Sequence, residues 1–217
     1  MNDVYAAVVK VGGSLARSRK ILTRLCFELS RLGKLYPLLL VPGGGPFADE
    51  VRKEYCKFKL SEDTAHWMAL MAMNQFGLML AELTGIETSE TLSGGRTLIF
   101  LPFRLIFEED PLPHSWDITS DSVAAYIAWK AGAPRVILLK DVDGVFSADP
   151  KRHKDARLLE SVKAFELSSL GASTGVDSFF SRLVSEYGVE AWVINGKYPK
   201  RLEKLLLEGR TLGTRIH

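Results

Sequence analysis

The chain has 217 residues, of which 47% are hydrophobic and 25% charged, and its formal net charge at pH 7 is +2. This length suits one large domain or two small ones, and the composition is typical of a soluble globular protein. The near-balanced charge gives no case for a surface that binds nucleic acid or a membrane. Cys26 and Cys56 lie far apart without Cys-x-x-Cys spacing, which fits a reducing compartment better than a disulfide or a zinc site. No apolar run reaches membrane-spanning length, so we expect a cytoplasmic protein.

The first apolar run, residues 4–14, is interrupted by Lys10 and closed by Gly12, Gly13 and Ser14. It predicts a buried strand that leads into a tight turn. Because glycine has no Cβ, the N–H groups of such a turn can approach a ligand closely, and with Lys10 beside them they form a natural seat for phosphate. Taken alone, the segment is equally compatible with a simple glycine turn beside a lysine that extends to solvent.

The following elements alternate between helix and strand. Leucines at helical spacing predict a helix over 22–32, an apolar run predicts a strand over 36–41, and a second helix is expected over about 47–58. Pro42, three glycines and Pro46 close the strand. Continuous apolar strands that alternate with helices predict an α/β fold, with a mainly parallel sheet covered by helices on both faces.

A long helix is expected over 61–83, opened by Ser61 and ended by Gly85. It holds four of the five methionines and is apolar nearly all round, so it should be buried on several sides. Core packing is the plainer interpretation, although a Met-rich helix also suits the border of a pocket or a subunit interface. His66 on this helix is as compatible with packing as with function. His114, in a later loop, is a candidate for contact with the phosphate of an acceptor, or else it is simply solvated.

The rest of the chain continues the alternation with shorter elements. Strands are expected at 97–101, 104–107, 136–139, 190–194 and, as an edge strand, 209–216, and helices at 120–131, 163–170, 179–187 and 200–208. Thr119 or Ser120 would cap the helix that carries Asp121 in its first turn. Leu158 and Leu159 are expected to pair at a sheet edge.

Chemically distinctive residues follow four of the expected strands. They are Gly12-Gly13-Ser14, Gly43-Gly44-Gly45, Lys140-Asp141 and Asn195-Gly196-Lys197. Ligands bind at the carboxyl ends of the strands in open α/β sheets, so these groups should meet on one rim if the sheet is parallel. That arrangement favours a phosphorylated ligand. The chain has no Walker lysine loop, and residues 43–48 fit the dinucleotide-binding pattern only loosely.

Motifs spread along the whole chain carry a resemblance to a known family. They are Lys10-Val-Gly-Gly-Ser14, Pro42-Gly-Gly-Gly45, Thr119-Ser-Asp121-Ser, Asp141-Val-Asp-Gly-Val-Phe146-x-x-Asp149-Pro150 and Gly209-x-x-x-Gly213-Thr214. In this order they resemble the amino acid kinase family, which includes acetylglutamate, aspartate, uridylate, carbamate and isopentenyl phosphate kinases. Within the family, the short length and the segment 115–122 are most similar to the aminomethylfuran-methyl phosphate kinases of methanofuran biosynthesis.

The resemblance implies a three-layer αβα sandwich of the carbamate kinase type, formed by a single domain over 1–217. Its lobes would bind the acceptor, at about 1–130, and the nucleotide, at about 131–217. The implied reaction is phosphoryl transfer from ATP, with Mg²⁺ carried mainly on the ATP phosphates, to an anionic small molecule. The expected acceptor is aminomethylfuran-methyl phosphate, and the product is a diphosphate. The family also implies a homo-oligomer, a dimer or larger, with no nucleic-acid or membrane partner.

The resemblance also gives each motif a role. Lys10 would bridge the transferring phosphoryl group, and Asp121 would orient Lys10 by its charge. The residues implied for nucleotide and phosphoryl binding are Gly12, Gly13, Ser14, Asp141, Asp143, Gly144, Phe146 and Asp149, and those for acceptor binding are Gly43, Gly44, Gly45, Asp117 and Thr119. Taken singly, Asp121 also suits a helix cap, Asp149 a turn and Phe146 core packing. The order of the motifs is what favours function.

The chain departs from the family pattern at one point. Many members carry a second catalytic lysine after a glycine-containing loop, but here the segment 173–178 is followed by no lysine. Lys140 or Lys197, each at a strand end, is a candidate for supplying that charge to the nucleotide phosphates. Asp177 in the same segment is a candidate for meeting a cationic acceptor such as an aminomethyl group.

Other functions remain open at this point. The nearest alternative is another branch of the family, acting on uridine monophosphate, isopentenyl phosphate or a carboxylate. A non-catalytic oligomer that binds a nucleotide or an oxyanion, similar to molybdenum storage proteins, fits the missing lysine but not the intact Lys10 and Asp121. A nicotinamide-dependent oxidoreductase is the alternative that the motifs favour least.

Overall fold

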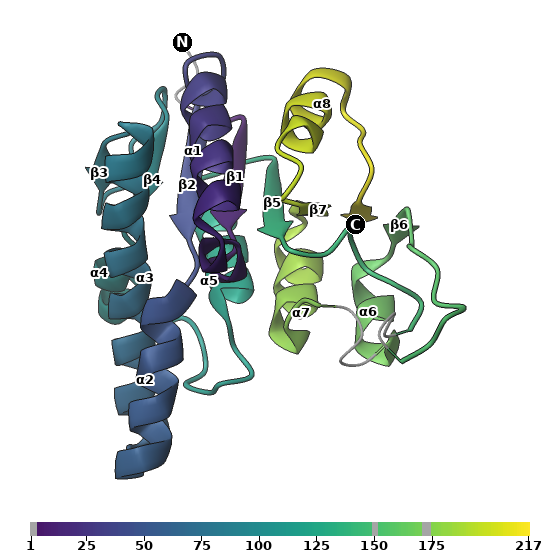
Figure 1. The fold of residues 1–217 in the computed structure, drawn as a ribbon. Coiled ribbons are helices and arrows are strands. Elements are labelled where there is room, and N and C mark those ends of the chain that lie inside the picture. Colours follow the sequence, from purple (N-terminus) through teal and green to yellow (C-terminus); the bar gives the residue numbers. More distant parts are fainter. Residues whose placement is uncertain (1–3, 149–151, 171–174) are drawn as a thin grey trace.

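The computed structural model describes residues 4–148, 152–170 and 175–217 of the chain. These residues form an eight-stranded sheet with helices on both faces, so the expected α/β fold is confirmed (Figure 1). The strands are β1 (Ala7–Val11), β2 (Leu38–Pro42), β3 (Thr88–Ser89), β4 (Leu98–Phe100), β5 (Arg135–Lys140), β6 (Ser161–Val162), β7 (Glu190–Asn195) and β8 (Thr214–Ile216). The helices are η1, a 3₁₀ turn (Gly13–Arg17), α1 (Arg19–Gly33), α2 (Gly45–Phe58), α3 (Glu62–Thr84), α4 (Phe103–Glu109), α5 (Ser120–Lys130), α6 (Ala164–Leu170), α7 (Ser178–Tyr187) and α8 (Lys200–Glu208).

The strand order across the described sheet is β3-β4-β2-β1-β5-β7-β8-β6. Neighbouring strands are parallel except for β7 and β8, which are antiparallel. The expectation of an edge strand over 209–216 was wrong in both length and place. Only Thr214–Ile216 is extended, and β6 pairs with its outer side. β6 is two residues long, too short to be recognised from an apolar run.

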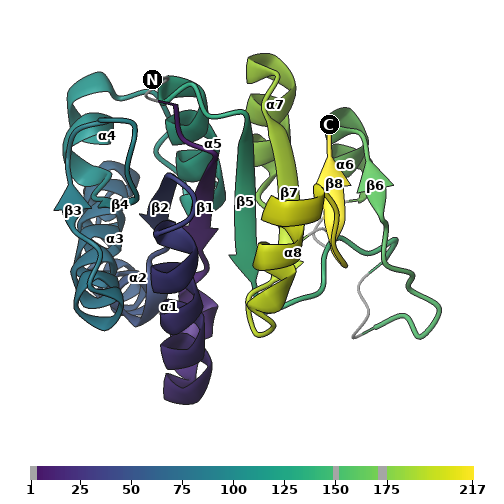
Figure 2. The same cartoon turned by 90° about the horizontal axis from the view of Figure 1, so that it is seen from above.

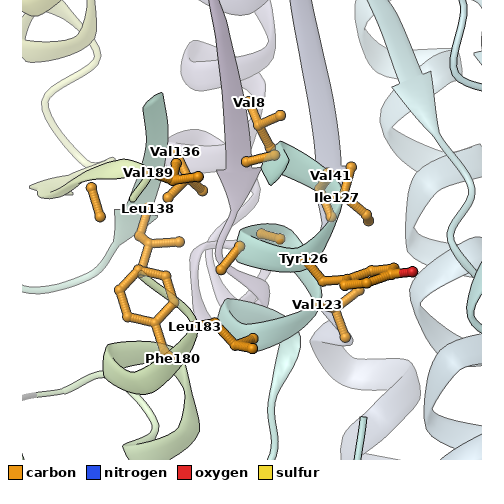
Figure 3. Packing of buried hydrophobic residues seen from close by; sticks show 14 of the residues in the cluster. Val8, Val41, Val123, Tyr126, Ile127, Val136, Leu138, Phe180, Leu183 and Val189 are labelled. Atoms are coloured by element: carbon orange, nitrogen blue, oxygen red, sulfur yellow. The ribbon is translucent and has the colours of Figure 1, made fainter. Parts of the chain in front are cut away.

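The central strands are buried on both faces, which explains their continuous apolar sequences. Along β1, Val8 packs into a cluster with α5 and α7 that includes Leu138, Val123 and Phe180 (Figure 3). Val9 packs into a second cluster, formed with α1 and α8. Figure 2 shows α5 and α7 on one face of the sheet, and α1 and α8 on the other. Alternate residues of β1 and β5 therefore point to opposite helical layers.

Several helix boundaries lie where the sequence signals them. The Ser61 side chain accepts a hydrogen bond from the Thr64 N–H at 3.2 Å, and Gly85 ends α3 with a φ of +70°. The Thr119 side chain accepts from the Asp121 N–H and caps α5. None of the helices in the described part of the chain combines the length and apolarity needed to cross a bilayer.

The expected strand over 104–107 was wrong, because this segment belongs to α4. The first helical N–H, that of Phe103, donates to the Asn74 side chain at 3.2 Å. Arg104 and Glu108 form an ion pair at 2.9 Å across one helical turn. The Arg104–Glu108 pair follows the spacing of four residues that a helix gives, whereas the short apolar run alone was also compatible with a period of two.

α2 and the first half of α3 extend beyond the carboxyl ends of β1 and β2 (Figure 1). These two helices pack against each other, and α2 also packs against η1. They therefore form a wall next to the rim of the sheet where the sequence places its glycines and lysines.

Candidate active site

The carboxyl ends of β2, β1, β5 and β7 lie side by side, because these strands are parallel neighbours in the sheet. The strand ends therefore meet on one rim, as the sequence predicts. The start of α5 lies against the same rim. A Cβ placed on Gly43 would stand 3.4 Å from the Ser120 hydroxyl oxygen. Lys140, as the last residue of β5, brings an ammonium group to this rim.

Two lysines share one buried carboxylate at the rim. Lys10 Nζ lies 2.6 Å from Asp121 Oδ1, and Lys140 Nζ donates a hydrogen bond to Asp121 Oδ2. Asp121 exposes only 1% of its surface and Lys10 4%. The structure thus brings together the two residues expected to be catalytic and adds Lys140 to them.

Burial and charge act on this cluster in opposite directions. Burial raises the pKa of the Asp121 carboxyl, but the two ammonium groups outweigh it and bring the pKa to about 2. Burial lowers the pKa of Lys10, Asp121 opposes that effect, and the charge of Lys140 reinforces it. Asp121 is therefore a permanent anion that holds two cations next to each other.

The glycine loops after β1 and β2 pack directly against each other. A Cβ on Gly13 would lie 2.2 Å from the backbone nitrogen of Gly45, which only the absence of a side chain allows. Gly45 itself has a φ of +58°. The Gly12 N–H donates to the Leu139 carbonyl at 2.8 Å and the Gly43 N–H to the Val11 carbonyl at 2.9 Å. These two amides are therefore engaged by backbone carbonyls, and the expected contact of the Gly12 amide with a phosphoryl oxygen finds no support here.

A cavity of about 410 Å³ opens between the glycine loops, α2, α3 and the start of α5. The residues expected from the sequence that line it are Gly13, Ser14, Gly44, Gly45 and Thr119. Two helices, α2 and α5, start at this cavity, and their N-termini favour an anion there.

Sequence reasoning missed most of the side chains on the cavity wall. The charged and aromatic ones are Arg17, Asp49, Arg52, Glu62 and Trp116, and His66 was left undecided. The Arg52 guanidinium lies 4.6 Å from the centre of the Trp116 ring. The signal available in the sequence was the spacing of Glu62, His66 and Met73, which places them on one face of α3.

Two polar nitrogens on this wall are buried without a hydrogen-bond partner, namely His66 Nε2 and Trp116 Nε1. Buried polar groups usually have partners, so these atoms are suited to contact a polar ligand in the cavity. Burial, together with the charge of the stacked His114, lowers the pKa of His66 to about 4. His66 is therefore neutral at pH 7, and its ring can either donate or accept one hydrogen bond at Nε2.

His114 does not line the cavity, so the expected contact with an acceptor phosphate finds no support. Its Nδ1 lies 2.7 Å from an Asp63 carboxylate oxygen and its Nε2 lies 2.9 Å from an Asp110 carboxylate oxygen. Its ring stacks on the His66 ring, with 4.2 Å between the ring centres. Burial lowers the pKa of His114, but the two carboxylates outweigh it and raise the pKa above its ordinary value. His114 thus connects α3 to the end of α4 and supports the wall that His66 forms.

Asp177 has a different environment from the one expected of a substrate ligand. Its carboxylate accepts hydrogen bonds from Thr119, from Ser122 and from the Phe180 N–H at the start of α7. It does not line the cavity. Asp177 caps two helices and holds their N-termini together. Asp117 is exposed and also lies outside the cavity wall, so the structure gives its expected contact with the acceptor no support.

Residues that follow β5 form hydrogen bonds with residues at the end of β7 and beyond it. The Asp143 carboxylate accepts hydrogen bonds from Asn195 at 2.9 Å and from Arg201 at 2.6 Å. Burial raises the pKa of Asp143, but these two donors outweigh it and lower the pKa. The Lys197 ammonium group donates to the Asp141 carbonyl at 2.9 Å. Two of the expected nucleotide ligands therefore contact protein groups here.

The segment after Asp143 packs closely against the end of the chain. A Cβ on Gly144 would stand 2.5 Å from the Thr214 hydroxyl oxygen. Phe146 forms an antiparallel bridge with Leu158, so the expected pairing of that leucine occurs, although its partner is a loop rather than an edge strand. Asp149 lies outside the described residues.

Within the described residues, no group of three or more His, Cys, Asp or Glu side chains is arranged to hold a metal ion. The lysines and free N–H groups at the rim suit phosphate oxygens as ligands.

Comparisons with known proteins show the family and the fold of this chain. A model of the amino acid kinase family matches residues 6–195. The chain is 31% identical to the [5-(aminomethyl)furan-3-yl]methyl phosphate kinase of Methanocaldococcus jannaschii over 96% of both chains. It is 24% identical to the uridylate kinase of Pyrococcus abyssi, over 96% of this chain and 98% of that one. The structure of a uridylate kinase from Archaeoglobus fulgidus shares the fold, with a TM-score of 0.76 at 21% identity over 98% of this chain and 100% of that one.

Proposed function

Because this chain belongs to the amino acid kinase family and is a phosphotransferase, we propose that it transfers the γ-phosphoryl group of ATP to a small aromatic phosphate monoester. The proposed acceptor is [5-(aminomethyl)furan-3-yl]methyl phosphate, on which the Methanocaldococcus jannaschii relative acts according to its name. The observation that carries this proposal is the cavity next to the glycine loops. It combines two helix N-termini with an aromatic ring and two carboxylates.

In the proposed reaction, an oxygen of the acceptor phosphate attacks the γ-phosphorus of ATP. The bond from that phosphorus to the oxygen bridging to the β-phosphate breaks, and the electron pair leaves with ADP. A fully ionised monoester and ATP carry the same total charge as the diphosphate product and ADP, so no general base is needed. Catalysis then depends on bringing anions together, which requires fixed positive charge and alignment. Lys10 supplies such a charge at the rim, and Asp121 fixes its position.

The lining of the cavity suits each part of this acceptor. Its phosphate fits beside Gly13, Gly44 and Gly45, where the N-termini of α2 and α5 favour an anion. Its furan ring fits against the Trp116 ring. Its ammonium group fits the Glu62 carboxylate, which also accepts a hydrogen bond from Tyr55 at 2.5 Å.

Mg²⁺ belongs to this proposal as the ion bound to the ATP phosphates. When bound, it neutralises charge on the β- and γ-phosphates.

A comparison of acceptors tests the proposal. ADP release from Mg-ATP is measured with the aminomethylfuran-methyl phosphate, the same compound without its aminomethyl group, uridine monophosphate, isopentenyl phosphate and acetylglutamate. We expect the highest kcat/KM for the first. Preferred turnover of uridine monophosphate, or of any other member of the panel, would overturn the proposed acceptor while leaving the kinase reaction in place.

A variant pair tests how the ammonium group is recognised. Glu62→Gln should raise the KM for the aminomethyl compound by about tenfold, because about 1.4 kcal/mol of charge-assisted bonding is lost. The KM for the compound without the amine should hardly change. Glu82→Gln, an equal change on the exposed side of α3, is the matched control. Equal effects of Glu62→Gln on both compounds would contradict this assignment.

A further inference from the structure

We propose that Lys140 is the second catalytic lysine of this protein and binds the phosphoryl group during its transfer. The proposal deepens the proposed function and rests on it. The family-type lysine after the segment 173–178 is absent from the sequence. The structure instead places Lys140 and Lys10 on the two oxygens of one carboxylate, that of Asp121.

The register of the sheet explains why these lysines meet. Lys10 on β1 pairs with Leu138 on β5. Lys140 lies two residues beyond Leu138, so its side chain points to the same face of the sheet. That face is covered by α5, whose first turn carries Asp121. Lys140 therefore reaches the carboxylate from one step closer to the carboxyl rim, where the ligands of such sheets bind.

The charge of the cluster is arranged for an anion. Two ammonium groups contact one carboxylate, and burying a cation without its own anion is costly. The remaining carboxylate whose charge acts on Lys10 is Asp177, and it is already occupied by donors from α5 and α7. A phosphoryl group would supply the missing negative charge. Lys140 keeps 17% of its side chain exposed, against 5% for Lys10, so it remains accessible to such a ligand.

Lys197 is the competing candidate, since it also lies just beyond a strand end on this rim. Its ammonium group donates to the backbone carbonyl of Asp141 rather than to Asp121. It is thus tied to the far side of β5, away from Lys10. The geometry favours Lys140 over Lys197 as the partner of Lys10 in phosphoryl transfer.

The test compares lysine variants of the full chain. Lys140→Met should lower kcat for the preferred acceptor by about 10²- to 10³-fold, with a change in the KM for ATP of less than about threefold. Lys130→Met, on the opposite end of α5, is the matched control and should leave kcat within about twofold of the wild type. Full kcat in Lys140→Met, or loss of kcat in Lys197→Met alone, would overturn the proposal.

Two further readouts separate a catalytic role from a structural one. Ethylamine should raise the kcat of Lys140→Ala at least tenfold, because a free amine can occupy the position of the missing side chain. A variant with a disordered site would not respond. Aluminium fluoride, which imitates the transferring phosphoryl group, should tighten Mg-ADP binding to the wild type but not to Lys140→Met. Equally tightened Mg-ADP binding in the wild type and in Lys140→Met would contradict the role of Lys140, and this test needs no known acceptor. A wild type that shows neither turnover nor tightening would overturn the kinase reaction itself.

Discussion

Replacing Asp121 by Asn isolates the electrostatic work of the buried carboxylate. Asn has nearly the shape of protonated Asp but carries no charge, so the change removes the anion and leaves the packing in place. Lys10 and Lys140 then lose the group that holds them at the rim. We expect lower stability at neutral pH together with the loss of phosphoryl transfer.

The expected loss of stability follows from the lowered pKa of Asp121. A carboxyl with an ordinary pKa of 3.8 and a native pKa of about 2 stabilises the fold at pH 7. At about 1.4 kcal/mol per pH unit, the difference amounts to about 2 kcal/mol. Because the native pKa is the lower one, this contribution is complete above 3.8 and is lost as the pH falls through about 2. At pH 3 only about half of this contribution remains.

Urea unfolding of the wild type and Asp121→Asn at pH 7 and pH 3 measures both values. The difference in unfolding free energy should be about 2 kcal/mol at pH 7 and about half of that at pH 3. Asp155→Asn, the same change at an exposed position, should cost less than about 0.5 kcal/mol at either pH. An Asp121→Asn protein as stable as the wild type at pH 7 would refute the electrostatic account, and so would a difference that is independent of pH.

The structure supports two further predictions. His114→Asn should lower stability most at acidic pH. A raised native pKa stabilises the fold fully below about 6.5, and this contribution disappears as the pH rises through the native pKa. The difference in Tm between wild type and variant should therefore be larger at pH 6 than at pH 9, and an equal difference would contradict the raised pKa. Asp177→Ala removes the hydrogen-bond acceptor at the start of both α5 and α7 and should lower the unfolding free energy by about 1–4 kcal/mol. Its effect on the KM of an amine-bearing acceptor should match that on the same acceptor without the amine, and a selective effect would restore the substrate role expected from the sequence.

The helices and strands could be predicted from the sequence where hydrophobic periodicity, helix caps and glycines indicated the same boundaries. Ser61, Thr119 and Gly85 mark helix ends through side-chain oxygens or a left-handed backbone, and these are local signals. The segment 104–107 was misjudged because its run of three apolar residues has no resolvable period. β6 was missed because its place in the sheet depends on pairing with a strand about fifty residues later.

The same difference between local and long-range signals explains which residues of the candidate site were predicted from the sequence. Lys10 and Asp121 were found because the order of the motifs along the chain resembles a known family, and the structure brings the two residues into contact. The choice between Lys140 and Lys197 depended on the register of β5 against β1, which no local pattern contains. Trp116 was not found because it reaches the cavity from an irregular loop, with neither helical nor strand spacing to indicate its direction.

The most direct test of the central claim is phosphorus NMR of the purified protein with Mg-ATP and [5-(aminomethyl)furan-3-yl]methyl phosphate. The account predicts that the monoester signal is replaced by the two coupled signals of a new diphosphate, with one ADP formed per product and none in Lys10→Met. ADP formed without a new diphosphate, or equal turnover by Lys10→Met, would contradict the claim that this site transfers a phosphoryl group from ATP to a phosphate acceptor.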